Sequence, residues 1–349
     1  AIVFAGPAIN FLFAIVLLFG MYSLHGQPVT PPMASAIIVD SAADKGGIKP
    51  HDKIIAIDGE KISRFEDIRR IVMVALDTPL EFTIQRDGEE VKLTETPEKQ
   101  ELTDRFGFSH SRGMLGIIGP GQGIAVKNIT SVAGRSVKDA DAARKALLRN
   151  MGKKTKIELR RGEETTDSLI VHPRGDLNEG LKDKESPDYN ALIVADGDIE
   201  EILELGFVSG IKASVTETAD ITRSTLYALG QIVTGTRSVT ELGGIIRIGA
   251  IAGDMAQAGL IAIITFTALL SINLGLINLF PIPMLDGGHL VFYAIEAIKG
   301  SPVSEKVQEY AFRFGFAVLI AMMLFANIND IVQLIICLLY TSDAADEED

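Results

Sequence analysis

The sequence predicts a polytopic α-helical membrane protein that carries a soluble α+β insert. The 349 residues are 47% hydrophobic, with a mean hydropathy of +0.25, but their charge is unevenly distributed. Residues 1–39 and 255–285 contain no Asp, Glu, Lys or Arg, whereas most of the charged residues lie between these two segments. An apolar frame around a charged middle is typical of membrane helices that flank an extramembrane domain.

Three segments are long and apolar enough to cross a hydrocarbon core of about 30 Å. Residues 1–25 form the first predicted span, residues 256–298 contain the second, and residues 310–336 form the third. Arg313 is expected near a membrane interface, because a charged side chain is costly at the bilayer centre.

Charge and cysteine usage exclude several classes of function. The net charge of −13 leaves no basic patch to neutralise phosphates, so no nucleic-acid partner is expected. The single cysteine, Cys337, excludes a disulfide within the chain and a thiolate zinc cluster.

Both ends of the sequence suggest a fragment. The string that begins at Cys337 resembles the translation of a common sequencing adapter, so we expect residues 337–349 to be an artefact; a native acidic tail is the alternative. Ala1 lies inside an apolar run without the basic region of a signal peptide, which indicates a chain truncated at this end as well.

The charged middle contains an internal repeat. Ile54–Arg70 aligns with Ile129–Lys145, and Leu80–Leu93 then aligns with Lys156–Leu169. Each copy is predicted to form a strand, a Gly turn, a helix and a β-hairpin, as two small tandem domains over residues 30–98 and 112–174. The alternative for each of the two domains is a spacer domain that binds no peptide.

The first copy resembles a PDZ domain of the bacterial type. The signature residues are Gly47, Ile48, Asp52, Asp58 and Gly59. PDZ domains bind an extended peptide as an extra strand, so the resemblance implies a peptide tail as partner of this domain. The second copy lacks the Gly-Ile part of the signature and is interpreted as a degenerate PDZ-like domain whose groove is in doubt.

Residues 199–236 are predicted to form amphipathic helices. Their apolar residues recur at helical spacing, with acidic and threonine-rich positions between them. Such helices would lie on the surface of the lipid bilayer or against the next span; packing on the soluble domains is the alternative.

The stretch "NLFPIPMLDGGHL", Asn278 to Leu290, carries the chemistry. Pro281 and Pro283 interrupt a helix there, and irregular backbone at membrane depth is tolerated only where protein or a wet cavity encloses it. Gly287 and Gly288 allow a close turn behind Asp286. A carboxylate held in this way suits the third protein ligand of a Zn²⁺ ion.

This stretch resembles the C-terminal signature of the site-2 protease family of intramembrane zinc metalloproteases, in particular its PDZ-bearing bacterial branch. The resemblance implies one Zn²⁺ ion as cofactor, with Asp286, which follows Leu285, as its third ligand. It also implies that Asn273 and Asn278 hold the substrate backbone. Val239–Gly249 resembles the family's Ser-Gly-Pro segment, with Gly244 in place of the proline.

The family's His-Glu-x-x-His motif is absent from these 349 residues. The five histidines are His25, His51, His110, His172 and His289, and none has another at i+4. We therefore expect the motif, with the first catalytic helix, to lie upstream of Ala1, and the fragment to be inactive alone. His289 is expected to have a packing role rather than to bind metal.

The resemblance implies cleavage of transmembrane segments in the bacterial inner membrane, with an anti-sigma factor as one possible substrate. Asp286 is expected near the cytoplasmic face and the PDZ-like domains in the periplasm, where they would gate substrates. The alternatives are a catalytically inactive PDZ-bearing membrane scaffold and a transporter with discontinuous helices. A transporter would need inverted repeats of its spans, and the sequence contains none.

Overall fold

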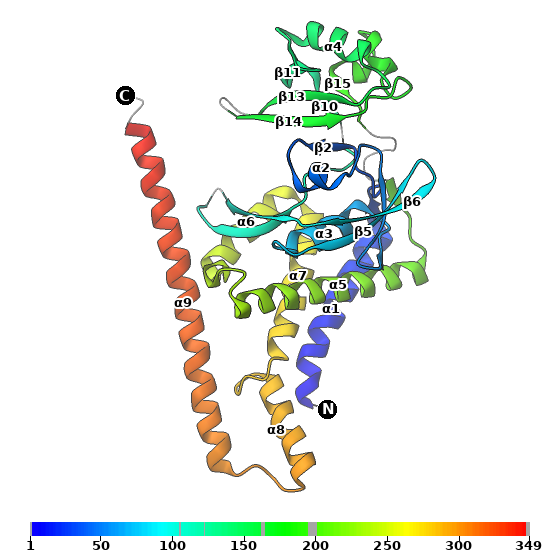
Figure 1. Cartoon of the computed structure of the whole chain (residues 1–349). Helices are drawn as coiled ribbons and strands as arrows, with labels where there is room; N and C mark the ends of the chain where they lie inside the picture. The colour runs from blue at the N-terminus through cyan, green and yellow to red at the C-terminus, as the bar shows by residue number, and fades with distance from the viewer. Residues whose placement is uncertain (1, 105, 122, 162–164, 195–200, 347–349) are drawn as a thin grey trace. The chain divides into compact units, whose positions relative to one another are not determined.

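The computed structural model describes the chain except residues 1, 105, 122, 162–164, 195–200 and 347–349 (Figure 1). The chain forms two compact units, which are considered separately. The membrane unit comprises Ala1–Gln27, Glu101–Ser111 and Glu204–Asp349, and the soluble unit comprises Pro28–Gln100 and Arg112–Leu203.

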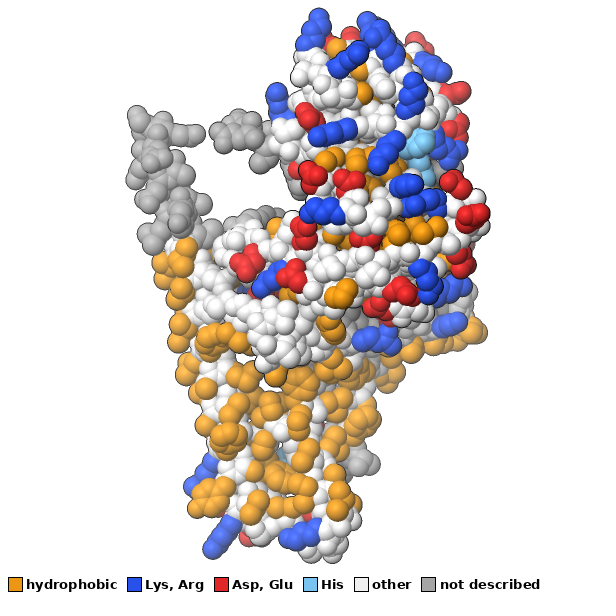
Figure 2. All heavy atoms as spheres, viewed as in Figure 1, with side chains coloured by type: hydrophobic (Ala, Val, Ile, Leu, Met, Phe, Trp, Pro, Cys, Tyr) orange, Lys and Arg blue, Asp and Glu red, His pale blue; other side chains and the backbone are white. Residues whose placement is uncertain are grey.

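Helices make up nearly all of the membrane unit. They are α1 (Ile2–His25), α5 (Phe207–Thr234), η4 (Val239–Glu241), α6 (Ile245–Ala258), α7 (Leu260–Asn278), α8 (Asp286–Lys299) and α9 (Glu305–Asp346). Three of them, α1, α7 and α9, are long and apolar enough to cross a membrane, which confirms the prediction of three spans. Figure 2 shows hydrophobic side chains spread over the surface of this unit, as a lipid environment requires.

Helices α1 and α7 pack closely because small residues meet at their contact. A Cβ at Gly275 would lie 3.1 Å from the carbonyl oxygen of Pro7, a tighter contact than most Cβ atoms make, so glycine favours this approach. The Ser271 hydroxyl donates to the carbonyl oxygen of Asn10 at 2.8 Å. Ala14, Leu18, Ala268 and Ile272 are among the buried side chains that complete this interface.

The structure differs from the sequence expectation around residues 199–236. It has one continuous helix, α5, rather than several, and residues 201–203 form strand β16; residues 195–200 lie outside the described part. Phe207, Val208 and Val233 expose most of their side chains, so α5 presents apolar surface. The last helix also extends beyond the predicted 310–336, with its candidate span at Glu305–Ile336.

Asp330 on α9 caps the first turn of α6. Its Oδ2 accepts hydrogen bonds from the backbone N–H groups of Gly244 and Arg247, both at 2.9 Å, and the carboxylate is fully buried. A helix start leaves such N–H groups without partners, and a carboxylate satisfies both the donors and the helix dipole. A proline at position 244 has no N–H, so glycine at this position supplies a donor that Asp330 uses.

The soluble unit contains short strands and small helices. The first lobe, residues 30–100 and 112–118, includes β2 (Ala36–Ile38), α2 (Ala42–Gly46), β3 (Lys53–Ile57), β4 (Glu60–Lys61), α3 (Phe65–Val74), β5 (Leu80–Arg86), β6 (Glu89–Glu95) and β9 (Ile117–Ile118). The second lobe, residues 123–194, includes β10 (Ile124–Ala125), η1 (Val126–Asn128), β11 (Ile129–Val132), β12 (Arg135–Ser136), α4 (Ala140–Arg149), β13 (Thr155–Arg161), β14 (Thr165–Val171), η2 (Glu179–Lys182), η3 (Pro187–Asn190) and β15 (Ala191–Leu192). Three further strands are β1 (Gln27–Val29), β7 (Glu98–Thr103) and β8 (Ser109–Met114). Both lobes therefore have the element order predicted from the repeat.

The two lobes are not separate tandem domains, because one sheet joins them. Its strand order is β12-β11-β13-β14-β2-β9, so two strands of the first lobe extend the sheet of the second. Alternate residues of a strand face opposite sides. Accordingly, Ile37 packs in the core of the first lobe, while Ala36 and Ile38 pack in the core of the second. The periodicity of a strand does not reveal which partner strand it joins, so the sequence did not show this sharing.

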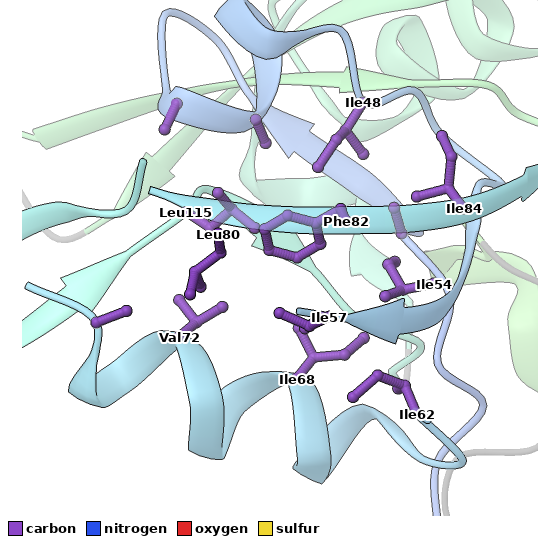
Figure 3. Close-up of a cluster of buried hydrophobic side chains, with 14 of the residues drawn as sticks. Ile48, Ile54, Ile57, Ile62, Ile68, Val72, Leu80, Phe82, Ile84 and Leu115 are labelled. Atoms are coloured by element: carbon purple, nitrogen blue, oxygen red, sulfur yellow. The ribbon is translucent and has the colours of Figure 1, made fainter. Parts of the chain in front are cut away.

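The core of the first lobe also needs residues that the sequence analysis assigned to the second domain. Leu115 is buried beside Leu80 and Phe82, with Val72 of α3 below them (Figure 3). The predicted boundary at residue 112 is therefore wrong, since the chain returns to the first lobe over residues 112–118 before it enters the second.

Glu95 gives the soluble unit an expected pH dependence. Its side chain is 3% exposed and lies so close to Gly46 that a Cβ there would overlap the carboxylate. Burial raises the pKa of Glu95 to about 7. The stability that Glu95 contributes is therefore fully present below its unfolded pKa of about 4.3 and is lost as the pH rises through 7.

We expect the unfolding midpoint of Glu95→Gln to fall less than that of the wild type between about pH 5 and pH 8. Thermal melting of the full chain in detergent, followed by circular dichroism, measures this difference. Glu89→Gln, which changes an exposed carboxylate on the same strand, is the matched control. Equal pH dependence of Glu95→Gln and the wild type would contradict the assignment.

Candidate metal site at the start of helix α8

The predicted metal ligand, Asp286, is the first residue of helix α8. The sequence predicts Asp286 beside a proline interruption within the span of residues 256–298. The structure shows that α7 ends at Asn278 and that Asp286 begins a new helix after a seven-residue connection. A carboxylate is favoured at this end of a helix, because the free N–H groups and the helix dipole carry partial positive charge. The carboxylate is half-buried.

Three glycines hold the connection between α7 and α8 in place. A Cβ at Gly287 would overlap the carbonyl oxygen of Leu279, and one at Gly288 would overlap that of Ile282. Gly315 on α9 is in equally close contact with the carbonyl oxygen of Pro283. The connection thus packs against α8 and α9 at these glycines, while Pro281 and Met284 are exposed.

The backbone beside Asp286 is strained. Met284 has a φ of 95°, a conformation that an unbranched L-residue rarely adopts, and no glycine relieves it. Pro281 and Pro283 cannot donate to a helical ladder, so the chain cannot relax into a continuous helix here. Strain of this kind costs about 1–3 kcal/mol and is often found at functional sites.

Asp286 faces helix α1 across the membrane unit. A Cβ at Gly6 would lie 3.0 Å from Oδ2 of Asp286, so the absence of a side chain at Gly6 makes room for the carboxylate. Within the described residues, no group of three or more His, Cys, Asp and Glu side chains is arranged to hold a metal ion. Asp286 is therefore a single candidate ligand, not a complete site.

The two asparagines expected at the substrate have different surroundings. Oδ1 of Asn273 accepts a hydrogen bond from the Thr225 hydroxyl of α5 at 3.2 Å. Asn278 is the last residue of α7 and is half-buried. Five residues along a helix correspond to a rotation of about 140°, so the two side chains leave α7 on different sides.

His289 contacts aromatic rings. Its imidazole lies 5.1 Å from the ring of Phe312 on α9, and Phe292 lies 5.8 Å from the same ring. These contacts place His289 in the packing between α8 and α9, as its expected role requires.

The PDZ signature residues are structural in the first lobe. Asp52 is buried, accepts two hydrogen bonds from Arg86 at 2.6 and 2.7 Å, and receives the backbone N–H of Lys49 at 2.7 Å. Arg86 also donates to the carbonyl oxygen of Gly47, and this bonding to Asp52 raises the pKa of Arg86. No local sequence pattern identifies Arg86, because its partner Asp52 lies 34 positions away in the chain.

Ile48, Asp58 and Gly59 complete the signature. Ile48 belongs to the buried core of the first lobe. Asp58 and Gly59 have φ values of 48° and 77°, which form the tight turn after β3. Glycine is favoured at such a position because it has no Cβ to clash with the backbone.

The contact at Gly315 gives a testable prediction. We expect Gly315→Ala to lower the thermal stability of the chain in detergent micelles, by about 1–3 kcal/mol, because the added methyl group overlaps the carbonyl of Pro283. Gly249→Ala in α6 is the matched control, since a Cβ there meets nothing within 4 Å. Replacing glycine inside a helix with alanine is otherwise stabilising, so Gly249→Ala should be neutral or better. Equal effects of the two substitutions would show that Gly315 is not a close contact.

Comparisons with known proteins confirm the family that the sequence resembles. A model of peptidase family M50 matches residues 1–322. A protein of Agrobacterium fabrum that is provisionally named a zinc metalloprotease is 33% identical over 335 residues, which cover 96% of this chain and 69% of that protein. The regulator of sigma E protease of Haemophilus influenzae is 30% identical over 359 residues, which cover 95% of this chain and 78% of that protein. The chain belongs to peptidase family M50, the site-2 protease family of zinc metalloproteases.

Proposed function

We propose that this chain is part of a zinc protease that cleaves peptide bonds within the transmembrane segments of other membrane proteins. The observation that carries the proposal is the placement of Asp286. Asp286 begins a helix and lies beside a strained connection that α9 contacts, and its carboxylate faces a glycine of α1. The start of a helix favours a carboxylate, and a carboxylate in an apolar segment is also a common mark of a functional site.

The carboxylate of Asp286 fits one ligand position of a zinc ion. Carboxylate oxygens are common zinc ligands, and catalytic zinc sites use three protein ligands. We propose that the other two are histidines of a His-Glu-x-x-His helix outside these 349 residues. Zinc bound there would supply Lewis-acid activation of water and of the substrate carbonyl. On this proposal the fragment alone is inactive.

We propose that Asn273 and Asn278 bind the substrate backbone. A substrate helix must unwind for cleavage, and its exposed amides then need hydrogen-bond partners. Because the Oδ1 atom of Asn273 accepts from Thr225, the amide is oriented with its N–H groups free to donate to a substrate carbonyl. Asn278 lies at the start of the connection that leads to Asp286.

The remaining parts of the proposal concern partners and location. The Haemophilus influenzae relative is named for regulation of sigma E, which supports an anti-sigma factor as one substrate. We place the protein in the bacterial inner membrane, with the soluble unit in the periplasm. There the first lobe would act as a PDZ domain that binds a peptide tail and gates access to the protease. The second lobe would be a degenerate copy.

An inactive membrane scaffold remains the second candidate. The absence of His-Glu-x-x-His from the sequence favours it, since a chain without this motif could still tether partners through its soluble unit. A scaffold, however, has no need for a carboxylate at Asp286 or for the strained turn at Met284.

The DNA sequence on either side of this coding segment distinguishes the zinc protease from the inactive scaffold. We expect the reading frame upstream of Ala1 to encode a helix with His-Glu-x-x-His, and the frame to change after Ile336. The completed protein should then retain about one zinc ion per chain, measured by mass spectrometry of the metal. Asp286→Asn should lose most of this zinc, whereas the control His289→Gln should keep it.

The variant that keeps its zinc should cleave a model transmembrane substrate, and the variant that loses its zinc should not. A complete gene without the motif would support the scaffold. Zinc retention in Asp286→Asn would show that another residue is the third ligand.

A further inference from the structure

The second lobe has a pocket between helix α4 and the hairpin of β11 and β12. The residues that line it are Val132, Ala133, Arg135, Ala146, Arg149 and Asn150. Its volume of about 310 Å³ lies at the lower end of the range of small-molecule sites. Arg135 and Arg149 are exposed, and within the described part of the chain neither side chain forms a hydrogen bond or an ion pair. The pocket therefore presents two guanidinium groups that have no acceptor of their own.

The pocket lies in a strongly basic segment. Residues 125–161 contain eleven Lys and Arg residues and three Asp and Glu residues, although the whole chain has a net charge of −13. Figure 2 shows Lys and Arg side chains on the part of the soluble unit that contains α4. One acidic side chain of this segment, Glu158, lies 4.0 Å from Lys156. The negative total hides this local basic surface, so the expectation of no basic patch is wrong for the second lobe.

The first lobe has an ion pair where the second lobe has two cations. In the alignment of the two repeat copies, Arg135 is equivalent to Glu60 and Lys145 is equivalent to Arg70. In the first lobe Arg70 of α3 donates to Glu60 of β4 at 2.7 Å. Because the two lobes share one order of elements, the same arrangement brings Lys145 of α4 toward Arg135 of β12. The position that is neutral in one lobe therefore carries two positive charges in the other.

Arg149 adds a third cation at this place. It is the last residue of α4 and follows Lys145 by four positions, whereas the last residue of α3 is Val74. Like charges four positions apart on a helix repel each other. The negative end of the helix dipole favours a cation at Arg149, but it gives no reason for Arg135 on the facing hairpin. An anion in the pocket would replace the repulsion among the three cations by attraction.

We propose that this pocket binds a phosphate monoester, whose oxygens accept hydrogen bonds from Arg135 and Arg149 with Lys145 beside them. A phosphate monoester carries about 1.5 to 2 negative charges at pH 7 and three strong acceptor oxygens. It therefore suits three cations better than a carboxylate, which has one charge and two oxygens. Guanidinium groups bind phosphate through two parallel N–H···O bonds. The carbon part of the ligand packs on Val132 and Ala146, which line the same pocket.

The phosphate belongs either to a soluble metabolite or to a lipid headgroup. Two probes distinguish these sources with the full chain in nanodiscs of phosphatidylcholine. The soluble probe is glycerol 3-phosphate, measured by isothermal titration calorimetry against glycerol. The lipid probe is a vesicle of phosphatidylcholine with phosphatidic acid, measured by co-flotation against a vesicle of phosphatidylcholine alone. Binding of the soluble probe alone indicates a metabolite, binding of the vesicle alone indicates a headgroup, and binding of both indicates that glycerol phosphate is sufficient.

Two arginine variants link the binding to the pocket. We expect Arg135→Gln and Arg149→Gln each to weaken the binding of the phosphate probe about tenfold, because each removes hydrogen bonds to a charged group. Lys182→Gln is the matched control, since it removes the same charge at an exposed position of η2 in the same lobe. This control should bind like the wild type.

Arg135→Glu gives a second readout that separates loss of the site from loss of the fold. Its carboxylate can pair with Lys145, as Glu60 pairs with Arg70 in the first lobe. We therefore expect this variant to lose the phosphate probe while its thermal unfolding midpoint stays at or above that of the wild type. Damage to the lobe would lower the midpoint as well.

Three results would overturn the proposal. The first is that neither phosphate probe binds the wild type. The second is that Lys182→Gln weakens binding as much as Arg135→Gln, which would show a general effect of charge. The third is that a poly-glutamate peptide binds as tightly as the phosphate probe, which would show that the pocket recognises an acidic polypeptide. None of these measurements depends on zinc or on cleavage, so the proposed protease is tested separately.

Discussion

The candidate site depends on one constraint: the irregular backbone between α7 and α8 must pack closely against the neighbouring helices. Hydrocarbon offers its carbonyl groups no hydrogen-bond donors, so an irregular connection can exist there only where neighbouring helices cover it. Glycines at positions 287, 288 and 315 allow α8 and α9 to lie directly against that connection. Asp286 owes its position to this packing, because it begins α8 immediately after this connection.

A few specific contacts between helices also stabilise the rest of the membrane unit. Helix ends need acceptors for their first N–H groups, and Asp330 of α9 provides one for α6 from a distant part of the sequence. Gly275 and Ser271 bring α7 against α1 in the same way, by close backbone approach and a single hydroxyl bond. Small and polar residues therefore allow the close approach of these helices, and apolar side chains such as Leu18 and Ile272 fill the rest of the interface.

In the soluble unit the two copies of the repeat keep one framework and differ in the contacts of their helices. Both lobes have the same order of strands and helix, and one shared sheet ties them together. The first lobe pairs Glu60 with Arg70, whereas the equivalent positions of the second lobe hold two cations, Arg135 and Lys145. The difference arises from a few residues at these positions, so one lobe neutralises its own charges and the other keeps a basic pocket.

The sequence alone determined the features that depend on local composition and spacing. Three uncharged runs long enough to cross a bilayer predicted the three spans, and the repeat predicted the element order of each lobe. The Leu-Asp-Gly stretch indicated the family. Only the tertiary structure decided that Asp286 begins a helix, that Ile37 and Ala36 of one strand serve two cores, and that Arg86 pairs with Asp52. The reason is physical: hydropathy and periodicity are properties of neighbours along the chain. Sheet partners, ion pairs and close backbone contacts, by contrast, join residues that are far apart in sequence and meet only when the chain has folded.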